Sequence, residues 1–231
     1  MNVAVGSMFC NSTAYLERYF AQVTALRDAL HPQGHALRLI LAEGDSTDNT
    51  WDALHAATTG PEAIPAEIVK RAHGGPMFGS VNIDRRWRQI SYVCDGILER
   101  VTPADDALLY VESDLIWQAE TMVTLLGHLE HVDAVAPMAM RGETFYDIWG
   151  YVADQRHFQP DAPYHPMLES PESRRVLHEL LSAGSCIAVR GAIARKTRFR
   201  PPELAIMGWC HQMLQMGHRL WLDPTVQTQH P

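Results

Sequence analysis

Strand-like and helix-like segments alternate over the first 137 residues of the chain. Short apolar runs typical of buried strands occupy residues 3–9, 37–42, 66–72, 108–111 and 132–137. Between them, apolar residues recur at helical spacing, for example from Leu16 to Leu30 and from Ile83 to Val101. This alternation predicts right-handed βαβ units and a mainly parallel sheet, so we expect an α/β protein.

The rest of the chain is less regular. Residues 138–170 form a long connection rich in aromatic residues, His and Pro. Beyond it we expect a helix over about 171–181, a strand over 185–190, a helix over about 203–216 and a strand over 219–223. Long connections inside a compact domain usually have a function, so we expect 138–170 to form a lid or a platform for an acceptor molecule.

The composition is that of an ordinary globular protein, with 46% hydrophobic and 20% charged residues. The formal net charge of -8 argues against broad binding of nucleic acid, although Arg85, Arg86 and Arg88 form a local basic stretch. The four cysteines are scattered without a C-x-x-C pair, as expected for buried thiols of a cytoplasmic protein. We see no signal peptide and no apolar run near the ~20 residues of a membrane span.

Two carboxylates follow the buried run that begins at Leu108. Glu112 and Asp114 are one residue apart, and alternate residues of a strand end point the same way. Acids at the tip of a buried strand are costly to desolvate unless a positive charge lies beside them. Two oxygen ligands on one side suit Mg²⁺ or Mn²⁺, which would keep open positions for phosphate oxygens. The alternative is a helix N-terminus, where the helix dipole favours acids.

A second polar stretch, EGDSTDNT over 43–50, follows the second strand-like run. Asp and Ser are common in turns and caps, and Ser46 is predicted to cap the helix that follows. Alternatively, Glu43 or Asp45 accepts hydrogen bonds from a nucleobase or from ribose hydroxyls. Ligands of parallel sheets bind outside the carboxyl ends of the strands, so we expect this stretch to share one rim with the acids after the fourth run.

The order of these features resembles that of the GT-A glycosyltransferases. Many of those enzymes carry a D-D-G-S-T-D-x-T stretch after the second strand and an acidic D-x-D triplet after the fourth, where this chain has EGDSTDNTWDAL and VESDLIW. Together with FYDIW further on, these variants look closest to CAP59-like mannosyltransferases and to family-2-like glycosyltransferases. The resemblance covers most of residues 3–137 and, more loosely, 184–230.

The resemblance implies the GT-A fold, a Rossmann-like central sheet flanked by helices on both faces, in a single domain over 1–231. Residues 1–137 would bind the nucleotide sugar and residues 138–231 the acceptor. The implied activity is transfer of a sugar from a UDP- or GDP-sugar to an acceptor hydroxyl, with Mn²⁺ or Mg²⁺ as cofactor.

The resemblance also implies donor-binding residues. Glu43 takes the place of the acid that contacts the nucleoside, and Ser7 and Phe9 end the strand that seats the base. Arg86, on the helix before the triplet, matches the basic residue that approaches the diphosphate or the sugar, and Arg85 is the near alternative. The full set of predicted donor-binding residues is Ser7, Phe9, Glu43, Asp45, Arg85, Arg86, Glu112 and Ser113.

Three residues are the implied metal ligands. Asp114 takes the place of the metal-binding last acid of the triplet, and Glu112 takes its first position, near the ribose or the metal. In many GT-A enzymes a strand after the last helix leads to a His that completes the metal site. His230 is in the corresponding place and would bind as the neutral base.

One feature of inverting members is missing, an acidic pair at the start of the last helix. That pair usually stands roughly twelve residues before the Gly that closes the helix. Counting back from Gly217 gives Ala205 and Ile206, and the nearest carboxylate is Glu203. An inverting enzyme needs a base for the acceptor hydroxyl, whereas in a retaining enzyme the departing phosphate can take that proton. We therefore expect retention, with Arg86 and with Asp147 of the FYDIWGY segment as catalytic candidates.

Three alternatives are kept. Nucleotidyltransferases share the sheet and use acids with Mg²⁺, but they generally carry a Gly-rich basic loop after the first strand, where this chain has GSMFCNST. A module that binds nucleotide sugars without catalysis is the second. The third concerns the acceptor: a saccharide or lipid-linked glycan is the default, and the alternative is a hydroxylated DNA base, with phosphates contacted by Arg85, Arg86, Arg88 or the run RKTRFR (195–200).

Overall fold

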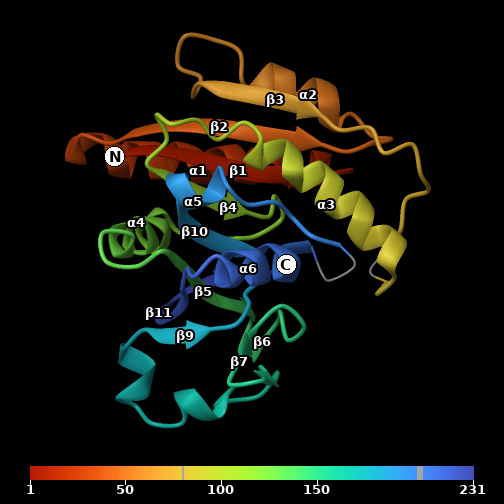
Figure 1. Ribbon diagram of the computed structural model, residues 1–231. Coiled ribbons are helices and arrows are strands. Elements are labelled where there is room, and N and C mark those ends of the chain that lie inside the picture. Colours follow the sequence, from red (N-terminus) through yellow and green to blue (C-terminus); the bar gives the residue numbers. More distant parts are fainter. Residues whose placement is uncertain (80, 202–204) are drawn as a thin grey trace.

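One mixed β-sheet runs through the centre of the molecule. The computed structural model describes residues 1–79, 81–201 and 205–231. From edge to edge the strands are β3 (Ala66–Lys70), β2 (Ala36–Glu43), β1 (Asn2–Phe9), β4 (Ala107–Val111), β10 (Cys186–Arg190), β5 (Ala134–Arg141), β11 (Leu220–Gln229) and β9 (His178–Leu180), as Figure 1 shows. The short β6 (Thr144–Phe145) pairs with the end of β5, and β7 (Val152–Ala153) and β8 (Arg156–His157) form a separate hairpin.

The predicted mainly parallel α/β sheet is confirmed, with one reversed strand in its middle. Strands β3, β2, β1 and β4 are parallel to one another, and β5 is parallel to β11. Strand β10 lies between β4 and β5 and runs antiparallel to both. Because β10 is reversed, it begins at the edge of the sheet where the parallel strands end.

Helices cover both faces of the sheet, as predicted. One face packs against α3 (Asp84–Leu98), α5 (Gly191–Ala194) and α6 (Ala205–Gln215), and the other against α1 (Leu16–Leu30), α2 (Thr50–Ala57) and α4 (Ala119–His128). Strand β4 serves both layers, because alternate side chains point to opposite faces. Leu108 and Tyr110 join the first core, and Leu109 and Val111 join the second. The apolar run that the sequence shows is therefore a strand buried on both sides.

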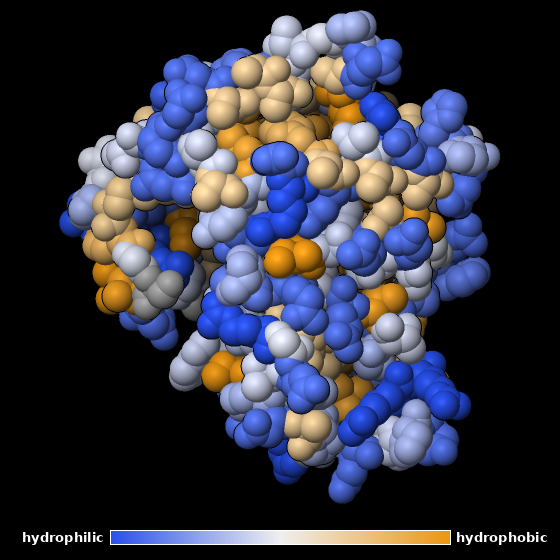
Figure 2. Space-filling view, turned by 180° about the vertical axis from the view of Figure 1, so that it is seen from behind, coloured by the Kyte–Doolittle hydropathy of each residue, from blue (hydrophilic) through white to orange (hydrophobic). Residues whose placement is uncertain are grey.

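Several large apolar residues outside the core are exposed on the surface. The face in Figure 2 carries many hydrophilic residues, with tan and orange groups among them, the broadest near the top of the view. Among the described large apolar residues Trp149 is the most exposed, at 64%. None of the described helices has the length and apolar character needed to cross a lipid bilayer.

The predicted helix over 171–181 is wrong. Ser173–Arg175 form a single 3₁₀ turn, and β9 follows as an edge strand antiparallel to β11. Leu180 pairs with Leu220 and is fully buried, whereas Glu179 is exposed. Pairing along β11 thus outweighs the local helical pattern, because strand preference depends mostly on the neighbours against which a residue packs.

The last strand is longer than predicted. β11 continues past the predicted end at 223 to Gln229, and its register against β5 shifts between Asp223 and Gln227. The shift carries the strand past Pro224, which has no N–H to donate to a neighbouring strand. The predicted helix over 203–216 is found as α6 from Ala205 on, while Glu203 lies outside the described residues.

Candidate functional site at the carboxyl rim of the sheet

The carboxyl ends of the parallel strands form one rim, and the predicted acids lie on it. Strand β2 ends at Glu43, β4 is followed by Glu112, and β11 is followed by His230. The strand order explains this arrangement, since β2, β1 and β4 are neighbours and β11 lies beside β5. Residues that are far apart in the sequence therefore meet at one edge.

Asp114 and His230 come together at this rim. Ile116 and Gln229 exchange two backbone hydrogen bonds of 2.8 Å, which tie the loop after β4 to the end of β11. As a result, Asp114 Oδ2 lies 3.3 Å from His230 Nε2. Arg18 of α1 also holds the loop, because it donates a hydrogen bond of 2.6 Å to the Asp114 carbonyl oxygen.

The two side chains of this pair influence each other's charge. Burial lowers the pKa of His230, but the hydrogen bond with Asp114 and the negative charges of Asp114 and Glu112 outweigh it, so the pKa is raised. The imidazole thus binds a second proton more readily than a free histidine does. A bound cation would take the place of that proton.

Glu112 and Asp147 form an acidic cluster beside the pair. Burial raises the pKa of Glu112 to about 8, and the charges of Asp114 and Asp147 add to the rise. Burial also raises the pKa of Asp147. Ser185, just before β10, donates a hydrogen bond of 3.0 Å to Asp147 Oδ2, and its carbonyl oxygen accepts the Glu112 N–H at 2.9 Å. Acids gathered in this way favour a positive ligand.

Asp114 and His230 fit a small divalent cation as two of its ligands. Neighbouring ligands of an octahedral ion with bonds of about 2.1 Å stand about 3 Å apart. The two side chains are 3.3 Å apart, so a small movement would let both bind one ion. Among the described residues, no three His, Cys, Asp or Glu side chains are grouped so that they could hold a metal ion, so Glu112 does not complete a three-residue site with this pair. The other coordination positions would be left to water or to a ligand such as a diphosphate.

A cavity of about 440 Å³ opens between the end of β1 and the start of α3. Its lining residues are Met8, Phe9, Cys10, Asn11, Gly44, His73, Met77, Phe78, Gly79, Arg86, Gln89, Ile90 and Val93. Arg86 lines the cavity and is also close enough to Glu112 and Tyr146 to interact with them electrostatically. Burial lowers the pKa of Arg86, and the interactions with Glu112 and Tyr146 oppose this shift. The size and the mixed lining are those of a small-molecule site.

The three clustered arginines of α3 have different surroundings. Arg86 is half-buried and lines the cavity. Arg85 is exposed, and its guanidinium carbon lies 5.8 Å from the centre of the Phe78 ring. Arg88 forms an exposed ion pair with Asp84. Arg86 is therefore the one of the three that can face an anion in the cavity.

The EGDSTDNT stretch holds the loop that lines the cavity. Asp45 Oδ2 accepts hydrogen bonds from the backbone N–H groups of His73, at 2.8 Å, and Gly74, at 2.7 Å. Glu43 Oε1 accepts the Ser46 N–H at 2.6 Å. Glu43 Oε2 is buried and has no hydrogen-bond partner among the described residues, so one acceptor atom of Glu43 is unused.

The prediction that Ser46 caps the next helix is wrong. α2 begins at Thr50, whose N–H donates to Asp48 Oδ1 at 3.0 Å. The Ser46 hydroxyl instead accepts the N–H of Asn11 at 2.9 Å, and Asp48 Oδ2 accepts the hydroxyl of Thr13 at 2.8 Å. The stretch thus ties the loop after β2 to the loop after β1, and the N-cap position of α2 falls on Asn49, which makes no side-chain capping hydrogen bond.

The remaining predicted donor-binding residues differ in their positions. Ser7 is fully buried, accepts a hydrogen bond of 2.9 Å from the Tyr19 hydroxyl and does not line the cavity. Phe9 lines the cavity and packs edge to face on Tyr19, with ring centres 5.1 Å apart. Ser113 is buried in the turn between Glu112 and Asp114. The structure therefore brings Phe9 to the cavity and leaves Ser7 beneath it.

Two residues that the sequence did not assign to the site lie at the rim. The Tyr146 ring stacks on His230, with ring centres 3.8 Å apart and planes 17° from parallel. Tyr146 is next to Asp147 in the FYDIW segment, but its stacking contact is with His230, which is more than eighty residues further along the chain. Ser185 has a φ of +58°, which is unusual for Ser, and no local motif points to it.

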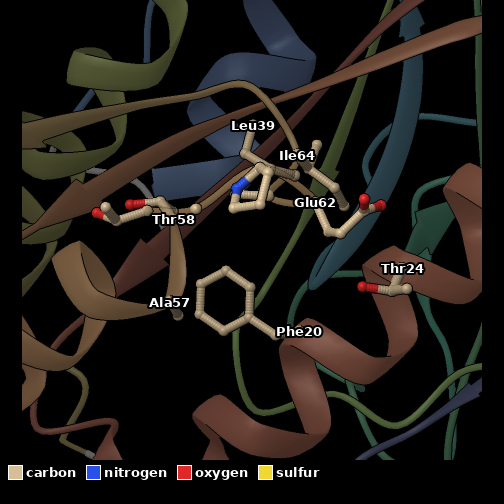
Figure 3. A pocket seen from close by; sticks show the side chains of 11 residues that line it. Phe20, Thr24, Leu39, Ala57, Thr58, Glu62 and Ile64 are labelled. Atoms are coloured by element: carbon tan, nitrogen blue, oxygen red, sulfur yellow. The ribbon is translucent and has the colours of Figure 1, made fainter.

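A second cavity lies away from these residues. It has a volume of about 330 Å³ and lies at the amino edge of β3, where Thr58, Glu62 and Ile64 surround it. Figure 3 shows the Phe20 ring pointing toward it from α1. No predicted site residue lines this cavity.

Solved structures resemble the whole chain at low sequence identity. A mannosyltransferase from Pyrobaculum calidifontis, solved with GDP-Man and Mn²⁺, has a TM-score of 0.61 and 16% identity, over 99% of this chain and 56% of its own. S. aureus TarS 1–349, solved with UDP-GlcNAc, has a TM-score of 0.57 and 15% identity, over 99% and 58%. A 4-diphosphocytidyl-2C-methyl-D-erythritol synthase from Anaerococcus prevotii has a TM-score of 0.51 and 10% identity, over 98% and 86%.

These matches establish the fold of the chain. It has the GT-A fold, as the sequence resemblance implied. The chain spans less than two thirds of the mannosyltransferase and TarS chains. No protein-family model and no curated protein sequence matches it.

Proposed function

We propose that this chain is a glycosyltransferase that uses a divalent cation to move a sugar from a nucleoside diphosphate sugar to an acceptor hydroxyl. The observation that carries the proposal is the meeting of Asp114 Oδ2 and His230 Nε2, 3.3 Å apart, on the rim where Arg86 lines a cavity. The likeness to structures solved with GDP-Man and Mn²⁺ and with UDP-GlcNAc supports a UDP- or GDP-sugar as donor.

In this proposal the nucleoside occupies the cavity at the end of β1. The base would contact the partly exposed ring of Phe78, because Phe9 is fully buried although it lines the cavity. The unused oxygen of Glu43 would accept a hydrogen bond from the base or the ribose once the ligand reaches it. Asp45 would act through the backbone of His73, because its carboxylate holds that loop in place.

The diphosphate lies between the cavity and the acids. Asp114 and His230 would hold Mn²⁺ or Mg²⁺, with Glu112 as an acceptor for the ribose. The cation would neutralise the charge that develops on the diphosphate as the bond between sugar and phosphate breaks. Arg86 adds a fixed positive charge on the other side. Ser113 would fix the turn that separates the two acids.

We propose a retaining outcome. The described first turn of α6 carries no acidic residue. As the bond from the anomeric carbon to phosphate breaks, its electron pair goes to the phosphate oxygen, which then takes the proton of the acceptor hydroxyl as the new bond forms. Asp147, held by the hydroxyl of Ser185 and the N–H of Gly150, would face the sugar and stabilise its developing positive charge.

We propose a saccharide as acceptor, seated by the long 138–170 connection. Asp147 lies in this connection, and Trp149, which is 64% exposed, offers an aromatic surface two residues away. A hydroxylated base in DNA is the competing acceptor. A gel shift that weakens with added salt would favour DNA, because phosphate contacts depend on counterion release.

The test is a transfer assay with UDP- and GDP-sugars, with and without Mn²⁺. We expect release of nucleoside diphosphate that requires the cation, and we expect Asp114→Asn to lose it while keeping the melting temperature of the wild type. Asp161→Asn, in an exposed part of the 138–170 connection, is the matched control and should keep full activity. Full activity of Asp114→Asn would remove the metal role from this residue.

A nucleotidyltransferase is the second candidate, because the synthase from Anaerococcus prevotii has the same fold with a TM-score of 0.51. The products separate the two reactions. A nucleotidyltransferase releases pyrophosphate from a nucleoside triphosphate, whereas a glycosyltransferase releases a nucleoside diphosphate from a sugar donor. The end of β1 and the loop after it carry no Lys or Arg from Gly6 to Thr13, which favours the glycosyltransferase.

A further inference from the structure

His230 is bracketed by groups that the sequence did not connect with it. On one side, the Tyr146 ring stacks on the imidazole, with ring centres 3.8 Å apart. At the edge of the imidazole, Nδ1 lies 3.0 Å from the Pro231 carbonyl oxygen and 3.2 Å from Arg141 Nη2. Arg141 also lies over the Tyr146 ring, with its guanidinium carbon 4.9 Å from the ring centre. We call Arg141, Tyr146 and the Pro231 carbonyl the His230 bracket.

The bracket is anchored to the end of β5 by backbone hydrogen bonds. The His230 N–H donates to the Met140 carbonyl at 2.7 Å, and the Tyr146 N–H donates to the Ala139 carbonyl at 2.8 Å. Both the imidazole and the ring stacked on it are therefore fixed to the same strand. A contact built in this way keeps its geometry better than one between two free surface side chains.

Nδ1 of His230 has two neighbours with opposite requirements. A hydrogen bond from Arg141 needs a lone pair on Nδ1, whereas a hydrogen bond to the Pro231 carbonyl needs a proton there. Nε2 faces Asp114 and needs its own lone pair to bind a cation, so the single proton must then be on Nδ1. The Pro231 carbonyl is the group that accepts it, and Arg141 Nη2 donates to the same oxygen at 2.7 Å.

We propose that Tyr146 and Arg141 are positioning residues for a divalent cation at His230: Tyr146 fixes the plane of the imidazole, and Arg141 fixes the carbonyl that keeps the proton on Nδ1. Metal-binding histidines usually donate their other N–H to a carbonyl or a carboxylate, and loss of that partner weakens metal affinity. The inference rests on the proposed function only in assuming that His230 binds a cation.

The experiment measures Mn²⁺ binding directly, by the electron paramagnetic resonance signal of free Mn²⁺, in the presence of UDP or GDP and without any sugar donor. We expect Tyr146→Ala to raise the dissociation constant of Mn²⁺ by about 10- to 100-fold, the usual effect of losing a group that orients a ligand. Tyr146→Phe keeps the ring and should stay within about twofold of the wild type. Arg141→Gln should weaken binding, and Arg141→Lys should restore only part of it, because Lys lacks the planar fork.

Tyr164→Ala is the matched control. It removes another partly exposed Tyr of the same connection, whose hydroxyl donates to the Glu143 carbonyl, and it should leave the Mn²⁺ constant unchanged. A second readout is the ¹⁵N spectrum of His230 with Mg²⁺ and UDP or GDP, which reports the ring nitrogen that carries the proton. We expect Nδ1–H in the wild type and in Tyr146→Phe, and in Arg141→Gln an added fraction of Nε2–H, from molecules in which His230 has released the cation.

The outcomes separate this inference from the proposed function. Equal Mn²⁺ constants for the wild type and Tyr146→Ala would overturn the positioning role and leave the metal site in place. Absence of Mn²⁺ binding in the wild type, with UDP and with GDP, would overturn the cation site and the inference together. Tight Mn²⁺ binding that depends on Tyr146, in a chain that transfers no sugar, would support the inference and count against the proposed reaction.

Discussion

The carboxylate of Asp147 lies so close to the backbone of Gly184 that a methyl group added at residue 184 would overlap Asp147 Oδ2. A methyl group added at Gly150 would also crowd this carboxylate, and the Gly150 N–H donates to Oδ1 at 3.0 Å. The acid is thus held against two glycines, because neither carries a side chain that would displace it. Its position is a property of the backbone around it as well as of its own rotamer.

Gly184→Ala should move Asp147 and remove activity. The methyl group cannot be accommodated without displacing the carboxylate, and overpacking of this kind typically costs about 1–3 kcal/mol. We expect turnover to fall by at least about tenfold and the melting temperature to fall with it. Both are measured by a transfer assay and by calorimetry.

Gly127→Ala is the control for this substitution. Gly127 lies exposed in α4, and nothing is within 4 Å of an added Cβ, so the variant should be as stable as the wild type or up to about 1 kcal/mol more stable. If Gly184→Ala kept the turnover of Gly127→Ala, the position of Asp147 would not matter for the reaction.

The place of Glu112 and Asp114 at the rim follows from a local signal in the sequence. Glu112 and Asp114 follow an apolar run, and the run is a strand buried on both faces with its carboxyl end at the rim. His230 was assigned through the resemblance alone. Its contact with Asp114 depends on β11 passing Pro224 with a shifted register, and no local pattern encodes that shift.

Other parts of the site depend on tertiary contacts that no sequence window contains. Tyr146 lies at the site because its ring stacks on His230. The hydrogen bonds of Asp45 and Ser46 are made with the loops after β3 and β1. The sequence near 178–180 predicts a helix instead of the strand found there, because the partner strand lies about forty residues further on. The fold class can be predicted because it depends on local patterns that repeat along the chain. An individual contact at the rim cannot, because it depends on one pair of residues that are distant in the sequence.

The stability of the chain should depend on the Arg38–Asp105 ion pair at the amino edge of the sheet. Arg38 Nε and Nη2 each lie 2.7 Å from an oxygen of Asp105, which is 4% exposed and also accepts the Thr102 N–H at 2.6 Å. Burial by itself would raise the pKa of Asp105, but the hydrogen bonds from Arg38 and Thr102 outweigh it and lower the pKa. Asp105→Asn should cost about 1–3 kcal/mol, less than a fully buried pair because Arg38 is partly exposed.

The pH dependence of this effect has a definite sign. A carboxylate whose pKa is lowered on folding stabilises the folded state fully above its unfolded pKa of about 3.9, and the contribution is lost as the pH falls through the lower, folded value. The difference in melting temperature between the wild type and Asp105→Asn should therefore be constant between about pH 5 and about pH 7. It should shrink below about pH 4. Asp106→Asn is the control with a smaller effect, because Asp106 accepts one exposed hydrogen bond from the Asn2 N–H and the amide oxygen of Asn can still accept it. A difference that grew on acidification would contradict the ion pair.

Cys10 should report occupancy of the cavity. It lines the cavity, whereas the other three cysteines are buried. Burial raises the pKa of the Cys10 thiol to about 11, and the charges of Glu43, Asp48 and Asp45 add to the rise. At pH 8 the thiolate fraction is then about 0.1%, roughly two orders of magnitude below that of an ordinary thiol. Alkylation by iodoacetamide, followed by mass spectrometry, should be slow and should quicken about tenfold per pH unit.

UDP or GDP with Mn²⁺ should protect Cys10 from this alkylation if the cavity binds the nucleoside. The control is Cys10→Ser, in which the native chain should take up no label. Labelling at the rate of a free thiol would show that Cys10 is more open than its contacts indicate. Labelling unaffected by either nucleotide would exclude the cavity as the nucleoside site.

Substitutions of Asp45 can test whether this carboxylate contacts the nucleoside or only holds the loop that begins at His73. Its carboxylate accepts the N–H groups of His73 and Gly74, and its φ is +51°, a conformation that Asn tolerates and Ala does not. We expect Asp45→Ala to speed amide hydrogen exchange over 73–79 without any ligand, since both acceptor contacts are lost. Because Met77 and Phe78 of this loop line the cavity, KM for the donor should rise by about tenfold while kcat changes less.

Asp45→Asn keeps one acceptor oxygen and the backbone conformation, so it should lie between the wild type and Asp45→Ala in both measurements. A raised KM with unchanged exchange over 73–79 would mean that Asp45 contacts the nucleoside itself, as the sequence alone allowed.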